Sequence, residues 1–169
     1  MELLNTGLVN AALPQVLALG DALRARGWRM AAAESCTGGL IAAACTSVAG
    51  SSDWFERGFV TYSNEAKMQM LGVPAQVLEQ HGAVSEPTAR AMLSGALRAA
   101  PVQLALAVTG IAGPGGAVPG KPVGTVWLAW GTAEQAQARR LQLPGDRAAV
   151  RGASVLAALQ CLLDVARAV

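Results

Sequence analysis

A short apolar run that ends in a tight polar turn and leads directly into a helix pattern is the feature that most constrains the fold of this chain. Residues 28–33 form the apolar run, which is typical of a buried strand, and residues 34–39 form the turn. Small apolar residues over 40–48 then predict a helix. Strand, turn and helix in this order indicate an α/β protein, in which helices cover the faces of a sheet.

The rest of the chain continues this alternation of strand and helix patterns. Further strand patterns occur at residues 55–62, 103–108, 123–130 and 137–143, the last expected to pair antiparallel with 123–130. Helix patterns occur at residues 8–26, 64–71, 74–80, about 87–99 and after Asp146, where Val150, Val155, Leu159, Leu162 and Ala166 form the apolar stripe. The sequence therefore predicts a single three-layer α/β/α domain over residues 1–169, with a mixed, partly antiparallel sheet and a core of about residues 8–167.

Individual residues mark where several of these helices begin. The hydroxyl of Ser63 and the carboxylate of Asp146 are suited to cap the helices that follow them. Pro87 lies where the first turn of a helix accepts proline. Pro14 lies inside the window 8–26, and we expect it to mark the first turn of that helix.

The apolar content of 53% makes a membrane protein the first class to test. No window of about 18–20 apolar residues is free of charged or turn-forming residues, which argues against a membrane-spanning helix. Much of the apolar excess is alanine, which suits close packing of helices. The N-terminus carries Glu2 and lacks the basic start of a signal peptide. We therefore expect a cytoplasmic protein without a membrane partner.

Charge and cysteine usage narrow the function further. The net charge of +2 is spread along the chain and aromatic residues make up 4%, which argues against a nucleic-acid partner. The cysteines Cys36, Cys45 and Cys161 form no Cys-x-x-Cys pair, and His81 is the single histidine. These features suit a reducing compartment and argue against disulfides and zinc, so we expect no metal and no cofactor. The small-residue helices lead us to expect a homo-oligomer, such as a homodimer.

The turn at residues 34–39 is the first place where chemistry is expected. Ser35 follows a strand and precedes a helix, where its hydroxyl can face a cleft, and N–H groups around Gly38 are potential donors to an oxyanion or a phosphate. Position alone favours a structural role, in which Ser35 or Thr37 only caps the helix. Cys36 is a rival nucleophile, or simply a small buried residue. The turn lacks the Gly-x-Ser-x-Gly pattern of the α/β-hydrolases.

A serine nucleophile needs a base, and the stretch 62–67 holds the single tyrosine of the chain, Tyr62, together with Lys67. A lysine, or a tyrosine–lysine pair, serves as a base only if the amine is partly neutral at about pH 7, although its reference pKa is about 10.4. Burial or a cationic neighbour would have to lower that pKa. From the residues alone, a solvated Lys67 and an ordinary strand Tyr62 are the simpler interpretation. His81 is most simply a residue at a helix end.

A loop rich in glycine and proline, residues 109–120, follows the apolar strand at 103–108, where α/β proteins place ligand-binding loops. Its glycines allow backbone N–H groups to approach an anion closely. The sequence before Lys121 imitates a phosphate-binding P-loop, but Pro122 stands where a hydroxyl is needed and a strand follows. The alternative is a turn-rich connection without a ligand. Arg147 and Arg151, four residues apart on one helix face, either bind a phosphate or remain solvated.

Several longer motifs follow one another along the chain, at residues 34–39, 50–52, 58–67, 71–73, 81–85, 108–114, 121–126 and 145–147. Together they closely resemble the CinA C-terminal domain family of nicotinamide-nucleotide amidohydrolases, from about residue 17 to the C-terminus. The chain departs from the family at residues 115–120, where relatives usually have an acidic residue and paired glycines and this chain reads Gly-Gly-Ala-Val-Pro-Gly. Many relatives also have a larger N-terminal domain, so we expect this chain to be a stand-alone form.

The resemblance implies hydrolysis of nicotinamide mononucleotide to nicotinate mononucleotide and ammonia by a Ser–Lys mechanism. It implies Ser35 as the nucleophile and Lys67 as its base, with Tyr62 relaying the proton. It implies oxyanion or substrate contacts at Thr37, Gly38, Gly39, Thr109, Gly110, Ala112, Gly113 and Arg147. Three alternatives stay open: a non-catalytic nucleotide-binding or regulatory module, an amidase for another amide, and a cysteine enzyme using Cys36.

Overall fold

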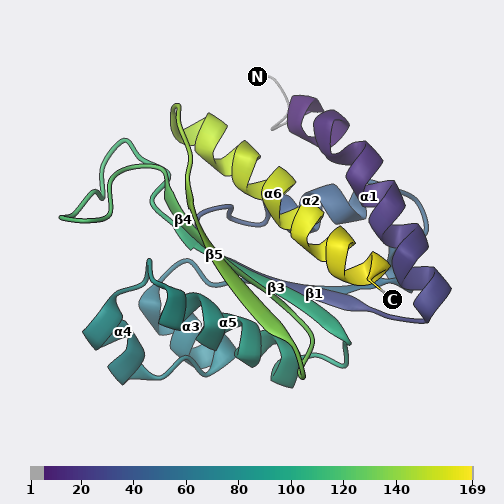
Figure 1. The fold of residues 1–169 in the computed structure, drawn as a ribbon, viewed down its shortest axis with the longest axis horizontal. Helices are drawn as coiled ribbons and strands as arrows, with labels where there is room; N and C mark the ends of the chain where they lie inside the picture. The colour runs from purple at the N-terminus through teal and green to yellow at the C-terminus, as the bar shows by residue number, and fades with distance from the viewer. Residues whose placement is uncertain (1–5, 169) are drawn as a thin grey trace.

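The computed structural model describes residues 6–168 and is built on a sheet with the strand order β2–β1–β3–β4–β5 (Figure 1). The strands are β1 (Met30–Glu34), β2 (Phe55–Val60), β3 (Leu104–Gly110), β4 (Thr125–Gly131) and β5 (Ala136–Gln142). Strand β1 pairs in parallel with β2 and β3, whereas β4 pairs antiparallel with β3 and β5. The predicted mixed, partly antiparallel sheet is confirmed.

Helices cover both faces of this sheet (Figure 1). One face carries α1 (Thr6–Arg26), α2 (Leu40–Thr46) and α6 (Arg147–Arg167), and the other carries α3 (Asn64–Leu71), α4 (Ala75–His81) and α5 (Glu86–Ala99). A short 3-10 turn, η1 (Ser51–Asp53), precedes β2 and was not predicted. The arrangement confirms the predicted three layers of helix, sheet and helix.

The predicted helix starts are confirmed in three of four places. The side chain of Ser63 accepts a hydrogen bond from the backbone of α3, and the side chain of Asp146 does the same for α6. Pro87 lies in the first turn of α5. The expectation for Pro14 is wrong, because α1 begins at Thr6 and runs through it. Pro14 has no N–H to donate to the carbonyl of Asn10. Both residues are exposed, so water can replace the missing hydrogen bond.

The two faces of the sheet carry side chains of different size, because successive residues of a strand point to opposite faces. The face under α1, α2 and α6 presents large side chains such as Leu104, Leu106 and Leu128. The opposite face presents alanine on three neighbouring strands: Ala31, Ala33, Ala105, Ala107 and Ala129. Helix α5 crosses this alanine surface and contacts β1, β3, β4 and β5. Small side chains on the sheet thus let α5 pack close to it.

Gly95 in α5 marks a close approach between α5 and the end of α3. A Cβ atom at this position would lie 2.0 Å from the carbonyl oxygen of Leu71. We expect Gly95→Ala to lower the free energy of unfolding by about 1–3 kcal/mol, because one of the two helices must move. Urea unfolding followed by circular dichroism measures the change.

Gly152 in α6 supplies the matched control for that substitution. A Cβ atom there would lie no closer than 3.6 Å to another residue, at Leu8 Cδ1, which is ordinary contact. Because alanine favours a helix over glycine by about 1 kcal/mol, Gly152→Ala should be neutral or stabilising. Equal stability of the two variants would show that the approach at Gly95 relaxes without cost.

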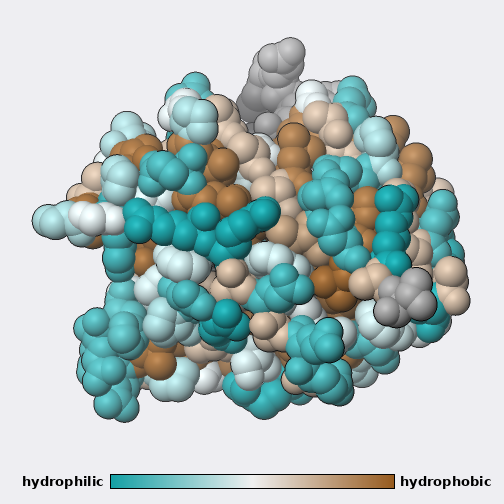
Figure 2. All heavy atoms as spheres, in the orientation of Figure 1, coloured by the Kyte–Doolittle hydropathy of each residue, from teal (hydrophilic) through white to brown (hydrophobic). Residues whose placement is uncertain are grey.

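Helix α6 has the length and hydropathy of a helix that could cross a membrane. Its predicted apolar stripe is confirmed, since Val150, Val155, Leu159, Leu162 and Ala166 are all buried. The helix packs against α1, β3 and β4. Figure 2 shows hydrophobic residues interspersed with hydrophilic ones on the upper half of the visible face, over α1 and α6. Packing against α1, β3 and β4 therefore accounts for the buried apolar stripe of α6.

Candidate active site

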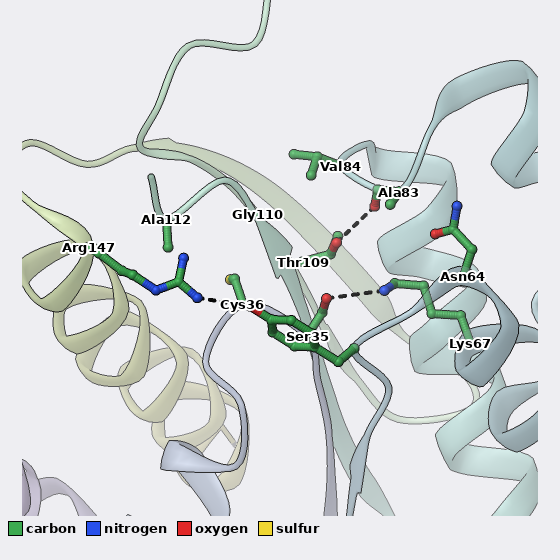
Figure 3. A pocket seen from close by; sticks show the side chains of 11 residues that line it. Ser35, Cys36, Asn64, Lys67, Ala83, Val84, Thr109, Gly110, Ala112 and Arg147 are labelled. Carbon is green, nitrogen blue, oxygen red and sulfur yellow. Dashed lines mark hydrogen bonds between the residues drawn. The ribbon is translucent and has the colours of Figure 1, made fainter. Parts of the chain in front are cut away.

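Ser35 directly follows β1, at the end of the sheet where the parallel strands β1 and β3 both have their carboxyl ends. Its backbone N–H donates to the carbonyl of Val108 at 3.0 Å, so the β1–β3 ladder continues one residue past β1 and holds Ser35 in place. A cavity of about 190 Å³ opens here, lined by residues from the β1–α2 turn, the start of α3, the α4–α5 loop, β3 and α6 (Figure 3). Ligand sites of α/β proteins occupy this position, beyond the carboxyl ends of parallel strands.

Ser35 and Lys67 form the central contact of the cavity. Lys67 Nζ lies 3.1 Å from Ser35 Oγ and donates to the carbonyl oxygen of Thr61 at 2.9 Å (Figure 3). The side chain of Lys67 is buried, being 1% exposed, so the interpretation of a solvated lysine is wrong. Burial lowers the pKa of the Lys67 amine, and within residues 6–168 no carboxylate pairs with it. A partly neutral amine within hydrogen-bond reach of a hydroxyl can act as its base.

Glu34 anchors the turn that carries Ser35, a role that the sequence analysis missed. Its carboxylate is fully buried and accepts hydrogen bonds from the hydroxyl of Thr37 at 2.7 Å and the N–H of Gly39 at 3.0 Å. It also accepts from the N–H groups of Ile41 at 3.1 Å and Ala42 at 2.8 Å. The first turn of α2 therefore binds a carboxylate of the chain itself, which suits the positive end of the helix dipole.

This anchoring changes what several predicted contact residues do. The Thr37 hydroxyl and the Gly39 N–H are occupied by Glu34, and the Gly38 N–H donates to the carbonyl of Ser35 at 3.0 Å. The N–H groups of Gly38 and Gly39, which were expected to bind an anion of the substrate, are therefore already paired within the turn. Nor does Ser35 or Thr37 cap α2, whose N-cap is Gly39 without a side-chain hydrogen bond.

Cys36 is poorly suited to be the nucleophile. The residue is buried, and burial raises the pKa of its thiol to about 11, although the positive charges of Arg151 and Lys67 act in the opposite direction. A thiol with this pKa stays protonated near neutrality, and the thiolate is the reactive form. The geometry therefore favours Ser35 over Cys36.

Tyr62 and Arg147 meet at the mouth of the cavity. Arg147 Nη2 donates to the Tyr62 hydroxyl at 2.8 Å, and Arg147 Nη1 donates to the carbonyl of Gly113 at 2.9 Å. The hydroxyl of Tyr62 is thus bound to Arg147, and the described residues give it no hydrogen bond to Lys67 of the kind that a proton relay needs. Figure 3 shows Arg147 extending from α6 on the side of the cavity opposite Lys67 and Asn64.

The first residues of the predicted glycine-rich loop line the cavity, and two of them extend β3. Thr109 and Gly110 belong to β3 rather than to the loop, because β4 pairs with them. Thr109, Gly110 and Ala112 line the cavity, and the Thr109 hydroxyl donates to the carbonyl of Ala83 at 2.8 Å (Figure 3). Gly110 must lack a side chain, since a Cβ atom would lie 2.7 Å from Val126 Cγ2.

Three lining residues were not singled out from the sequence: Asn64, Ala83 and Val84. Asn64 precedes Lys67 by three residues, and this helical spacing could have placed both on one face of α3. No comparable signal marks Ala83 and Val84, which depend on the path of the α4–α5 loop. Among residues 6–168, His, Cys, Asp and Glu side chains form no group of three or more that could hold a metal ion.

Comparison with known proteins gives concordant matches. The sequence model of the CinA C-terminal domain family matches residues 14–166. The nicotinamide-nucleotide amidohydrolase PncC of Escherichia coli strain K12 is 56% identical over 145 residues, which cover 85% of this chain and 88% of that protein. The Pseudomonas putida protein of the same name is 52% identical and covers 87% and 92%. A CinA-like protein of Syntrophobacter fumaroxidans is 54% identical, and the matched region spans only 35% of its length.

Solved structures resemble the whole fold. The competence damage-inducible protein A of Klebsiella pneumoniae subsp. pneumoniae superposes with a TM-score of 0.87 at 42% identity, covering 89% of this chain and 94% of that one. The competence/damage inducible protein of Agrobacterium tumefaciens superposes with a TM-score of 0.86 at 41% identity, covering 98% and 99%. The similarity therefore extends to the elements that carry the cavity.

Proposed function

The chain belongs to the CinA C-terminal domain family, and on that premise we propose that it is a nicotinamide-nucleotide amidohydrolase. It converts nicotinamide mononucleotide and water to nicotinate mononucleotide and ammonia. The relatives that carry this enzyme name match it over most of both chains. The observation that supports the chemistry is the buried Lys67 amine, 3.1 Å from the hydroxyl of Ser35.

The first half of the reaction forms an acyl-enzyme. Ser35 Oγ attacks the carboxamide carbon while its proton moves to Lys67 Nζ, which the carbonyl of Thr61 holds in place. The tetrahedral intermediate then collapses as Lys67 returns that proton to the leaving nitrogen, and ammonia departs. The nicotinoyl group is left as an ester on Ser35.

The second half uses the same pair on water. Lys67 Nζ, neutral again, accepts a proton from a water molecule that attacks the ester carbon. The new tetrahedral intermediate releases Ser35 Oγ, which takes the proton back from Lys67. The carboxylic acid product loses its proton to solvent and leaves as the carboxylate, and both residues return to their starting state.

The dimensions of the cavity suggest how the substrate lies. A volume of about 190 Å³ is below the range of about 300–1,000 Å³ found for sites that bury drug-sized ligands. It therefore suits the pyridine ring with its carboxamide and leaves the ribose phosphate at the mouth, where Arg147 lies. The atypical residues 115–120 do not line the cavity, so their difference from relatives does not touch the reacting group.

A non-catalytic nucleotide-binding module is the second candidate, since related proteins carry competence names. Such a module needs a cavity and basic groups, but it gains nothing from a desolvated lysine against a serine hydroxyl. Burying an amine costs free energy, which a catalytic base would justify. The Ser35–Lys67 contact thus favours the enzyme.

Ammonia release from nicotinamide mononucleotide, measured on EDTA-treated protein across pH, tests the proposal. We expect turnover without added metal, because Ser35 and Lys67 supply both nucleophile and base. The pKa of Lys67 is lowered from its usual 10.5, and only the neutral amine accepts the serine proton. The rate should therefore rise with pH through this lowered pKa and level off above it.

The alternatives give different profiles in the same assay. Binding of the nucleotide without ammonia release at any pH would make the chain a binding module. A rate that rises only near the ordinary lysine pKa would mean that the buried amine is not the base. Nicotinamide riboside, which lacks the phosphate, serves as the control for the contribution of the cavity mouth.

A further inference from the structure

Arg151 holds the turn that carries Ser35 from the side opposite Glu34. It lies on α6 one turn after Arg147 and does not line the cavity. Its Nε donates to the carbonyl of Cys36 at 3.1 Å, and its Nη2 donates to the carbonyl of Thr37 at 3.1 Å. One half-buried guanidinium group thus binds two successive carbonyls directly after the nucleophile.

The hydrogen bonds of the turn leave two N–H groups over. The carbonyl of Ser35 accepts from Gly38, that of Cys36 accepts from Arg151, and that of Thr37 accepts from both Arg151 and the N–H of Leu40. The N–H of Ser35 donates to Val108, and that of Gly39 to Glu34. Within residues 6–168, no oxygen accepts from the N–H groups of Cys36 and Thr37, and the Cys36 N–H has only the sulfur of its own side chain as a partner. Buried N–H groups are normally paired, so these two are available to a ligand.

We propose that Arg151 is a positioning residue that orients the Cys36–Thr37 peptide so that the Thr37 N–H, together with the N–H of Cys36, receives the oxyanion. This inference rests on the proposed amidohydrolase function. In a trans peptide the N–H and the carbonyl point in opposite directions, so a Cys36 carbonyl fixed toward Arg151 directs the Thr37 N–H away from α6. The N–H of the residue after a nucleophile serves this purpose in other serine hydrolases.

The need for such a clamp follows from the composition of the turn. Gly38 and Gly39 have positive φ angles of 59° and 95°, a region that glycine enters without steric cost, so hydrogen bonds rather than side-chain sterics must hold the end of the turn. A rotated Cys36–Thr37 peptide would present its carbonyl, rather than its N–H, to the developing negative charge. Glu34 already fixes α2 and the Thr37 side chain, and the Leu40 N–H also holds the Thr37 carbonyl at 3.2 Å, so the specific contribution of Arg151 is the direction of the Cys36 carbonyl.

Steady-state kinetics of Arg151→Met tests this role. Loss of an oxyanion donor typically lowers kcat by about 10²–10³-fold, and a misoriented donor should cost about 10–100-fold. KM for nicotinamide mononucleotide should change little, because Arg151 does not line the cavity. The pH at which the rate rises should stay the same, since Lys67 keeps its environment. Millimolar guanidinium ion should restore part of kcat in Arg151→Ala, and Arg151→Lys should be intermediate.

Arg98→Met is the matched control, because Arg98 also donates to a backbone carbonyl, that of Leu71, on the opposite face of the sheet. It should keep the kcat of the unaltered protein even if its stability falls. Unchanged kcat in Arg151→Met, a change confined to KM, or a shift of the pH profile would overturn the inference while leaving the amidohydrolase function standing. A loss of kcat in proportion to the loss of folded protein, without guanidinium rescue, would also overturn it.

Labelling of Ser35 by a fluorophosphonate separates this inference from the proposed function. The probe needs a reactive serine and places a phosphoryl oxygen where the oxyanion would lie, but it does not need the nucleotide. Slower labelling of Arg151→Met than of Arg98→Met supports the positioning role even if nicotinamide mononucleotide is not the substrate. Equal labelling of the two variants overturns it.

Discussion

Ser35→Ala is expected to abolish ammonia release from nicotinamide mononucleotide, whereas Cys36→Ala should leave most of it. Ser35 Oγ lies 3.1 Å from the base, and without it no acyl-enzyme can form. Removal of the nucleophile of a comparable hydrolase costs about 10⁶-fold in kcat. The Cys36 thiol, with its pKa raised to about 11 by burial, contributes no nucleophile near neutrality. Its replacement should affect packing more than chemistry.

Intact-protein mass spectrometry after rapid quenching adds a direct readout. The unaltered protein and Cys36→Ala should both show the mass of a nicotinoyl nucleotide ester when turnover at neutral pH is quenched with acid, and Ser35→Ala should show none. Thermal unfolding of the variants confirms that each is folded. An adduct that persists in Ser35→Ala and disappears in Cys36→Ala would assign the nucleophile to the cysteine.

The contact between Ser35 and Lys67 depends on strand register, which the sequence does not display. Glu34 at the end of β1 pairs with Val60 at the end of β2, and the Thr61 N–H donates to the Glu34 carbonyl at 2.8 Å. Ser35 and Thr61 therefore leave the sheet side by side, and α3 then returns Lys67 to the same place. Periodicity predicted each of these elements, but only the parallel pairing of β1 and β2 brings their ends together.

Patterns of hydrophobicity predicted the layers of the fold because both helices and strands bury apolar side chains where they pack against each other. The stripe of α6 and the nearly continuous apolar runs of β3 and β4 are examples. The burial of Lys67 was not predictable in this way, since α3 is short and its other polar residues, such as Asn64 and Glu65, are exposed. Tertiary packing against the end of β1, rather than local sequence, removes the amine from water.

The anchoring of the turn shows a second limit of sequence patterns. Glu34 sits at the end of an apolar strand, and nothing in the spacing tells which N–H groups its carboxylate will bind. In the structure this carboxylate accepts hydrogen bonds from the N–H groups at the start of α2. These N–H groups are therefore already paired and do not bind an anion of the substrate. The identities of Ser35, Tyr62 and Lys67 as candidates came from family motifs, whereas their partners came from the fold.

Lys67→Met is expected to lower kcat by about 10²–10⁴-fold, the usual contribution of a general base, and at the same time to stabilise the protein at neutral pH. Methionine is unbranched and apolar, so it can fill the space of the buried lysine side chain. The folded-state pKa of Lys67 lies below its usual 10.5, so the unfolded chain binds a proton more readily than the folded one. The free energy of unfolding of the unaltered protein therefore rises with pH across the interval between the lowered and the usual pKa.

That pH dependence should disappear in Lys67→Met, whose stability advantage is greatest below the interval and vanishes above it. Urea unfolding at several pH values measures the effect. Lys67→Arg is the control, because its guanidinium stays charged and should leave the protein both inactive and less stable. Because nucleophile and base act as a unit, Ser35→Ala with Lys67→Met should be no slower than Ser35→Ala alone. If the two losses multiply instead, or if Lys67→Met keeps most of its kcat, Lys67 is not the base that activates Ser35.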